Sequence, residues 1–151
     1  MSVDHFEPRL LGRAFDSYGK ASSDTFKGGC LFVDHDSFLH VEHQLGFSAV
    51  ETVRAKQAYK QMALHHCVVV EAYLTDSGAF KAKAFVNHIW EHCQRLHCCG
   101  ANAHHKNGIA ERAVQSVSNI ARAFILHASA HWKDGIDLSL WPMDVTCATH
   151  L

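Results

Sequence analysis

An acidic residue follows the most apolar run of the chain. The run CVVVEAYL, residues 67–74, is rich in β-branched side chains and predicts a buried parallel strand. Asp76 comes directly after this strand, in the turn TDSG. Because ligands of open α/β sheets collect beyond the carboxyl ends of the strands, a functional carboxylate is expected at this position. An ordinary turn or helix-capping role explains Asp76 equally well.

A second acidic residue stands where a polar loop meets a helix. The stretch HHKNGIAERAVQ, residues 104–115, passes from polar residues into a helical repeat, and Glu111 falls in the first helical turn beside the apolar stripe. A carboxylate there complements the positive end of the helix dipole without any further role. Because Asp76 also stands at the end of an element, the two acids together indicate a site.

Histidine and cysteine gather in a third stretch, where the chemistry would be zinc binding. The span HCQRLHCCG is followed closely by His104 and His105. Structural zinc sites usually draw on two separated pairs of the CxxC type, and Cys93 and Cys98 do not have that spacing. Adjacent residues of a strand point to opposite faces, so Cys98 and Cys99 cannot both bind one ion. Packing of a cysteine in the core fits better, and a non-catalytic zinc or protein-interaction module remains an alternative.

These side chains need a scaffold, and the hydrophobic pattern predicts one. CLFVDH and FLHVEHQL predict two strands of a hairpin, and Ser48 with Glu51 forms a capping box that starts a helix. Further helices are expected at about 79–93 and about 109–130, with a short strand at RLHCCG between them and Pro142 in the first turn of a last helix. This order predicts an α/β fold with an antiparallel hairpin followed by parallel crossovers.

Length and composition restrict the class of protein. The 151 residues suffice for one domain, and the formal net charge of -1 excludes a chain that is basic as a whole. The N-terminal residues do not resemble a signal peptide, and no apolar run is long enough for a membrane span. Six cysteines without a secretory signal indicate reduced thiols. We therefore expect a nuclear or cytoplasmic protein that is neither secreted nor membrane-bound.

Several stretches together resemble the catalytic core of retroviral and retrotransposon integrases, most closely the copia-type elements. The matching segments are YLTDSGAFKAKAF and CGANAHHKNGIAERAVQSVSNIARA, with SVDHFEPRLLGRAFDSYGK, GGCLFVDHDS, HVEHQLGFSAVETVRAKQ and HASAHWKDGIDLSLWPM in the corresponding order. The resemblance covers almost the whole chain, so residues 1–151 are expected to form a single core domain, truncated at its N-terminus. It implies a ribonuclease H-like α/β fold, in which helices flank a mixed sheet of an antiparallel hairpin and parallel strands.

The resemblance also implies a triad of two aspartates and one glutamate. Matching motifs place it at Asp4, Asp76 and Glu111. Asp34 is a rival for the first acid, but in the family that acid lies on the opening strand, whereas Asp34 belongs to the second. Carboxylates are the hard ligands that Mg2+ prefers, and two Mg2+ or Mn2+ ions can promote phosphodiester displacement by water in DNA cleavage or by a DNA 3′-hydroxyl in strand transfer.

The same resemblance implies contacts with DNA, both the ends of the element and the target. The loop ANAHHKNG matches the mobile loop that precedes the glutamate in the family, and the helix after it carries a polar edge. The residues expected to contact DNA are His104, His105, Lys106, Asn107, Arg112, Gln115 and Arg122. A solvated surface explains each of them as well. The family further implies a homo-oligomer.

Several features depart from the family pattern. Only three residues precede Asp4, so we expect a short opening strand with unpaired backbone groups at a sheet edge. Cys67 stands where glycine would suit the turn into the next strand. Such departures leave an inactive element fragment as an alternative to an active integrase. A ribonuclease H-like nuclease that cuts RNA–DNA hybrids without joining strands is a further alternative.

Overall fold

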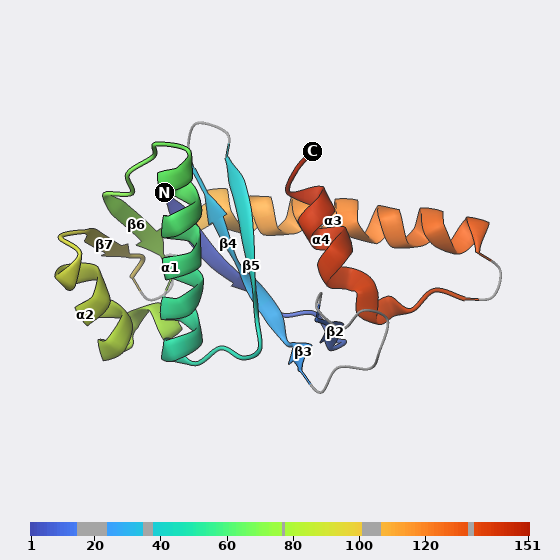
Figure 1. The fold of residues 1–151 in the computed structure, drawn as a ribbon, viewed down its shortest axis with the longest axis horizontal. Helices are drawn as coiled ribbons and strands as arrows, with labels where there is room; N and C mark the ends of the chain where they lie inside the picture. The colour runs from blue at the N-terminus through green and yellow to red at the C-terminus, as the bar shows by residue number, and fades with distance from the viewer. Residues whose placement is uncertain (15–23, 35–37, 77, 101–106, 133–134) are drawn as a thin grey trace.

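A mixed five-stranded sheet forms the centre of the molecule, with helices on both faces (Figure 1). The computed structural model describes residues 1–14, 24–34, 38–76, 78–100, 107–132 and 135–151. The sheet has the order β5-β4-β1-β6-β7, and its strands are β1 (Ser2–Phe6), β4 (Gly28–Val33), β5 (Leu39–Gln44), β6 (Ala72–Thr75) and β7 (Arg95–Cys98). The helices are α1 (Ala49–His65), α2 (Lys83–Glu91), α3 (Gly108–His131) and α4 (Trp141–Ala148).

Strand β1 lies in the middle of this sheet. It pairs antiparallel with β4 over its whole length, from Ser2 opposite Val33 to Phe6 opposite Gly29. On its other side it pairs in parallel with β6, which in turn pairs in parallel with β7. The expectation that the opening strand lies at a sheet edge is therefore wrong, because β4 and β6 pair with it on either side.

Alternation along the strands divides the apolar residues between two cores. Val3, Cys30 and Phe32 belong to the core under α1 and α2, whereas Leu31 belongs to the core under α3 and α4. Residues directly opposite each other in an antiparallel pair point to the same face of the sheet. Asp4 is opposite Leu31, so its carboxylate is on the face that α3 and α4 cover.

Helix α1 begins and ends with recognisable capping interactions. Ser48 accepts a hydrogen bond on Oγ from the backbone N–H of Glu51 at 3.2 Å, which confirms the predicted helix start. At the other end Cys67 has φ of +58°, its N–H donates to the carbonyl of Leu64, and that of Val68 donates to Ala63. This pairing is the Schellman turn, in which glycine is the usual residue.

The strand and helix expected between residues 67 and 93 are shorter than predicted. The Schellman turn occupies the start of the apolar run, and β6 (Ala72–Thr75) begins where Ala72 pairs with Arg95 of β7. The expected helix is divided into a 3-10 turn, η2 (Ala79–Lys81), and α2, because Ala82 between them has extended backbone with ψ of 139°. Helix α3 closely matches its prediction.

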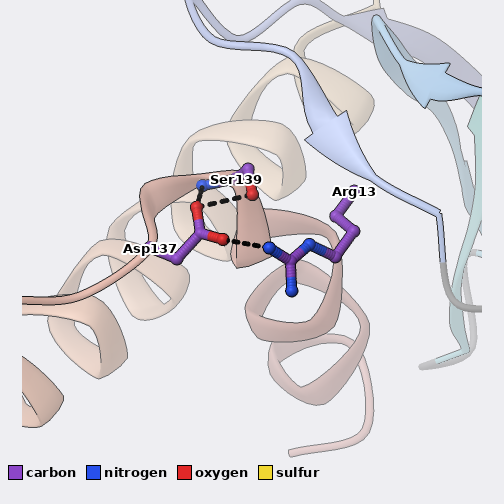
Figure 2. Close-up of polar contacts among 3 residues, drawn as sticks. All are labelled: Arg13, Asp137 and Ser139. Atoms are coloured by element: carbon purple, nitrogen blue, oxygen red, sulfur yellow. Dashed lines mark hydrogen bonds and ion pairs between the residues drawn. The ribbon is translucent and has the colours of Figure 1, made fainter. Parts of the chain in front are cut away.

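A polar clasp joins the two ends of the sequence (Figure 2). Two short strands, β2 (Gly12–Arg13) and β3 (Thr25–Phe26), pair outside the main sheet, and a 3-10 turn, η4 (Leu138–Leu140), precedes α4. Arg13 donates to Asp137 at 2.5 Å, while the backbone N–H and hydroxyl of Ser139 donate to the other carboxylate oxygen at 2.9 and 2.6 Å. The hydrogen bonds from Ser139 and then the charge of Arg13 lower the pKa of Asp137.

The side chain of Trp141 continues this junction. Its Nε1 donates to the carbonyl of Leu10 at 2.9 Å, and its ring with that of Pro142 covers Gly12 closely. None of the helices among the described residues is long and apolar enough to cross a membrane.

Candidate active site

Asp4 and Asp76 line one cavity of about 310 Å³ at an end of the sheet. Asp4 lies on β1, and Asp76 follows β6 directly. The parallel register places Ser2 beside Leu74 and Val3 beside Thr75, so the next step along both strands brings the two aspartates together. Both side chains are partly exposed. Two carboxylates from adjacent strands therefore open onto the same solvent-accessible space.

The turn after Asp76 forms another wall of this cavity. Gly78 and Ala79 line it, and Gly78 has φ of +103°, a conformation that a residue with a side chain adopts only with strain. The chain then enters η2, where Phe80 is buried.

His5 brings an aromatic ring to the cavity but no positive charge. Its ring stacks on Phe80 with centroids 4.4 Å apart, and its other neighbour, Phe47, meets it edge to face at 5.5 Å. Burial among these rings lowers the pKa of His5 to about 4. The imidazole is therefore neutral at physiological pH and does not compete with a bound cation for the adjacent carboxylates.

Glu7 also lines the cavity, and the sequence reasoning did not select it. It is an exposed residue just beyond β1 and before Pro8. The signal that would have found it is an acid three residues after Asp4, at the point where the strand ends. A third acidic residue therefore lines the cavity that Asp4 and Asp76 share.

Helix α3 is attached to β1 at its first turn. Asn107 is fully buried, and its Nδ2 donates to the backbone carbonyl of Val3 at 3.1 Å. Ala110 is also fully buried, in the core under α3 and α4. Glu111, the next residue, is exposed and is not among the residues that line the cavity of Asp4 and Asp76. Glu111 therefore lies in the first turn of a helix that is bonded to β1, but its side chain is outside the cavity of the two aspartates.

The described part of the chain contains no group of three or more His, Cys, Asp or Glu side chains arranged to hold one metal ion. The structure thus brings Asp4 and Asp76 to a common cavity but does not gather all three acids of the expected triad. The donor chemistry of that cavity, the carboxylates of Asp4 and Asp76, fits a hard divalent cation. Asp34 lines a different cavity, three register positions from Asp4 along β4.

The residues expected to contact DNA fall into three groups. Arg112, Gln115 and Arg122 are exposed on α3. Asn107 is buried, so the expectation that it contacts DNA at the surface is wrong. The sequence placed it in a polar loop, but its side-chain amide donates a hydrogen bond to Val3 in β1. His104, His105 and Lys106 lie outside the described residues.

A larger hollow of about 770 Å³ extends along α3 beside this site. Arg122 and Ser118 line one side of it, Arg9 lines the other, and Trp141 contributes an aromatic ring. Phe6 and Glu7 line both this hollow and the cavity of the aspartates. The acidic cavity therefore adjoins a surface that carries two arginines.

Solved structures of retroviral integrase cores share this fold. The HTLV-2 integrase catalytic core domain, solved in complex with magnesium in a trimeric form, has a TM-score of 0.61 and 14% identity over 98% of this chain and 80% of that one. The catalytic core domain of BIV integrase has a TM-score of 0.57 and 12% sequence identity, over 99% of this chain and 77% of that one. A chain of the simian T-cell lymphotropic virus intasome has a TM-score of 0.66 and 12% sequence identity, over 95% of this chain and 45% of that one. No protein-family model and no curated protein sequence matches the chain.

Proposed function

We propose that this chain is a DDE-type integrase core of the copia retrotransposon type, which cleaves DNA and joins strands in DNA integration. The single observation that carries the proposal is the common cavity of Asp4 and Asp76, at the ends of adjacent parallel strands in an integrase-like fold. Carboxylates in that arrangement suit phosphodiester chemistry that uses divalent cations rather than a protein nucleophile.

Asp4 and Asp76 would hold Mg2+ or Mn2+, and we propose two ions in the complete site. When bound, such ions activate the attacking oxygen and stabilise the leaving oxygen of a phosphodiester. The HTLV-2 core with the same fold was solved in complex with magnesium. The carboxylates fit because they are hard oxygen donors in a space open to solvent.

Glu111 is the proposed third ligand. Its position in the first turn of α3 is held near β1 by the hydrogen bond from Asn107 to Val3. In the conformation described here its side chain is exposed and lies outside the cavity. We propose that it completes the site when metal and DNA are bound, and that Glu7, which already lines the cavity, is the rival for this role.

The exposed edge of α3 would bind the DNA backbone. Arg112, Gln115 and Arg122 are exposed on this helix, and Arg9 faces the hollow beside it. Arginine is suited to phosphate because its guanidinium donates two parallel hydrogen bonds. We also propose that the chain acts as a homo-oligomer; the HTLV-2 cores were solved in trimeric and dimeric forms.

The proposal is tested by a Mn2+-dependent disintegration assay with the full 151-residue chain. The substrate is a branched DNA that mimics the product of strand transfer, and the expected result is its resolution into two duplexes. Asp76→Asn should reduce the rate by at least about 100-fold, the scale for loss of a major electrostatic group at a reacting centre. Glu71→Gln is the matched control, because Glu71 is an exposed acid just before β6, at the other end of this strand from Asp76, and its ion pair with Arg95 has a length of 3.4 Å.

Three outcomes would change the assignment. Activity that survives in Asp76→Asn would refute the mechanism. Loss of activity in Asp34→Asn with retention in Asp4→Asn would reassign the first acid. Cleavage of an RNA–DNA hybrid without any joining of DNA strands would favour the ribonuclease H-like nuclease.

A further inference from the structure

Two histidines lie one turn apart at the C-terminal end of α3. His127 and His131 are both exposed, and the end of the helix that carries them projects away from the five-stranded sheet (Figure 1). Their rings are stacked, with centroids 4.5 Å apart and planes 29° apart. Residues four positions apart on a helix share one face, and this is the spacing with which pairs of helical histidines bind zinc. Neither residue lines the cavity of Asp4 and Asp76.

A hydrogen bond orients the ring of His131 for metal binding. Its Nδ1 lies 2.9 Å from the carbonyl oxygen of His127, and because a carbonyl only accepts, Nδ1 is the donor. In the neutral imidazole the lone pair is then on Nε2. A bond from the second ring nitrogen to a backbone carbonyl is a usual support of a metal-binding histidine. Among the described residues, no hydrogen bond or ion pair involves the ring nitrogens of His127.

The electrostatic surroundings of this pair favour a cation. The stretch AFILHASAHW, residues 123–132, contains no lysine and no arginine. His131 is the last residue of α3, where carbonyl groups without partners in the helix form the negative end of the helix dipole. A metal ion bound by the two rings is therefore attracted by the helix end and meets no basic side chain on the same turns.

A second histidine pair with the same spacing differs in its surroundings. The rings of His88 and His92 on α2 have centroids 4.2 Å apart, and Nδ1 of His92 lies 2.9 Å from the carbonyl oxygen of His88. However, His88 is only 8% exposed, and its Nδ1 and Nε2 lie 2.9 and 3.0 Å from side-chain nitrogens of Lys56 and Gln57. Spacing alone thus does not provide metal ligands in this fold, whereas the pair on α3 is also open to solvent.

We propose that His127 and His131 bind a divalent transition-metal ion of the class that prefers imidazole, represented by Zn2+ and Ni2+. Imidazole nitrogens suit Zn2+, Ni2+ and Cu2+, whereas Mg2+ prefers the oxygens of carboxylates and water. Two side chains are fewer than the three or four of most zinc centres, so water would fill the remaining positions. The site differs in place and in metal preference from the carboxylate cavity proposed to hold Mg2+ or Mn2+.

The test is an NMR titration of the 15N-labelled full chain with NiCl2 under reducing conditions. Ni2+ is paramagnetic and broadens amide signals close to it, so small amounts should first broaden the signals of residues 127–132. Calorimetry of the same titration gives the dissociation constant. MgCl2 is the comparison with a hard cation and should leave these signals unchanged.

Variants isolate the spacing of the two rings. The double variant Ser129→His/His131→Ser keeps the composition of the chain, but its two histidines are two positions apart and do not face each other. It should bind Ni2+ at the end of α3 at least about tenfold more weakly, the lower limit for loss of a group that supports a metal site. His127→Gln should have the same effect. The double variant His97→Gln/His150→Gln is the control, because it removes two exposed histidines elsewhere and should leave the affinity unchanged.

Several outcomes would overturn the proposal. Equal Ni2+ affinity in the parent chain and in Ser129→His/His131→Ser would show that the spacing does not matter. Broadening that first affects signals outside residues 127–132 would place the metal elsewhere. Shifts of these signals by Mg2+ with similar affinity would show that imidazole is not the ligand. Circular dichroism checks that each variant is folded. Since Asp4 and Asp76 remain in every variant, the DNA assay tests the proposed function separately.

Discussion

Asn107 joins the helix that carries Glu111 to the strand that carries Asp4. Its Nδ2 lies 3.1 Å from the carbonyl oxygen of Val3, one residue before Asp4, and its side chain is fully buried. This hydrogen bond spans 104 positions of sequence. The position of the third proposed ligand relative to the first thus depends on an amide that itself takes no part in the chemistry.

Asn107→Ala should lower the free energy of unfolding by about 1–2 kcal/mol, because the carbonyl of Val3 loses its buried donor. Chemical denaturation followed by circular dichroism measures this change. Asn119→Ala is the control: Asn119 is exposed on the same helix and only accepts from Arg122 at 3.4 Å, so its loss should be within about 0.5 kcal/mol of zero. Equal effects of the two substitutions would contradict a structural role for Asn107.

Binding of divalent cations should raise the melting temperature through Asp4 and Asp76. Mn2+ or Mg2+ that binds the folded chain and not the unfolded chain stabilises it by mass action. We expect a rise in Tm with Mn2+ concentration in the parent chain and in Glu71→Gln, and little or no rise in Asp4→Asn or Asp76→Asn. Glu111→Gln and Glu7→Gln measured in the same series show which glutamate contributes. An undiminished rise in Asp76→Asn would place the cation elsewhere.

The stability of the chain should increase in alkaline solution because of Lys56. This side chain is fully buried, with its Nζ 2.9 Å from Nδ1 of His88, and burial followed by the charge of Lys60 lowers its pKa from 10.5 to about 8. Between those values the unfolded chain binds more protons than the folded chain, so stability rises with pH from about 8 to about 10.5. Below pH 8 the burial of a charged lysine opposes folding.

Lys56→Met should abolish this part of the pH dependence and should stabilise the chain below pH 8. Urea unfolding of both proteins between pH 7 and pH 10.5 gives the difference directly, since other titrating groups are common to both. A difference that is constant across this range would show that Lys56 titrates normally in the folded chain.

Replacing Cys67 with glycine should stabilise the protein. Cys67 and Cys93 have φ of +58° and +55°, each in the Schellman turn that ends a helix, and left-handed backbone costs a residue with a side chain about 1–2 kcal/mol. Cys67→Gly and Cys93→Gly should each recover about 1 kcal/mol in denaturant unfolding, minus the entropy that glycine adds to the unfolded chain. Cys147→Gly, within α4, should instead destabilise by about 1 kcal/mol.

Gly12→Ala should destabilise the junction between the two ends of the sequence. A Cβ at Gly12 would clash with Cγ of Pro142 and would lie 2.7 Å from the ring of Trp141, and neither ring can move freely. We expect a loss of about 1–3 kcal/mol, the usual cost of overpacking, with a change in tryptophan fluorescence. Gly46→Ala is the control, because a Cβ there meets nothing within 4 Å.

Local patterns in the sequence predicted much of the fold. The hairpin of β4 and β5, the start of α1 at Ser48 and the long helix α3 each depend on residues close in sequence, whose periodicity and capping are visible directly. The sequence also predicted a turn that favours glycine at Cys67, and the positive φ of this residue agrees with that prediction. Residues 68–71 were predicted as strand because apolar composition does not show where a neighbouring strand begins to pair, and β7 first pairs with β6 at Ala72.

The candidate site depended on contacts that sequence patterns do not contain. The cavity that Asp4 and Asp76 share depends on the parallel register of β1 and β6, and the motifs alone suggested a common site only by resemblance. Asn107 read as a polar loop residue because its acceptor, Val3, is distant in sequence. Glu7 was missed because an acid after a strand is common at surfaces.

The clasp of Arg13 and Asp137 has a consequence for the order of folding. Its partners are 124 positions apart, and the bond from Trp141 to Leu10 spans 131. Closing such long loops in an open chain is entropically unfavourable, and the cost falls once the intervening sheet has brought the segments together. The clasp should therefore be among the last contacts to form and the first to release. Thermal fluctuations can break these contacts while the five strands of the main sheet remain paired. Backbone amide hydrogen exchange should therefore be faster in β2 than in β1.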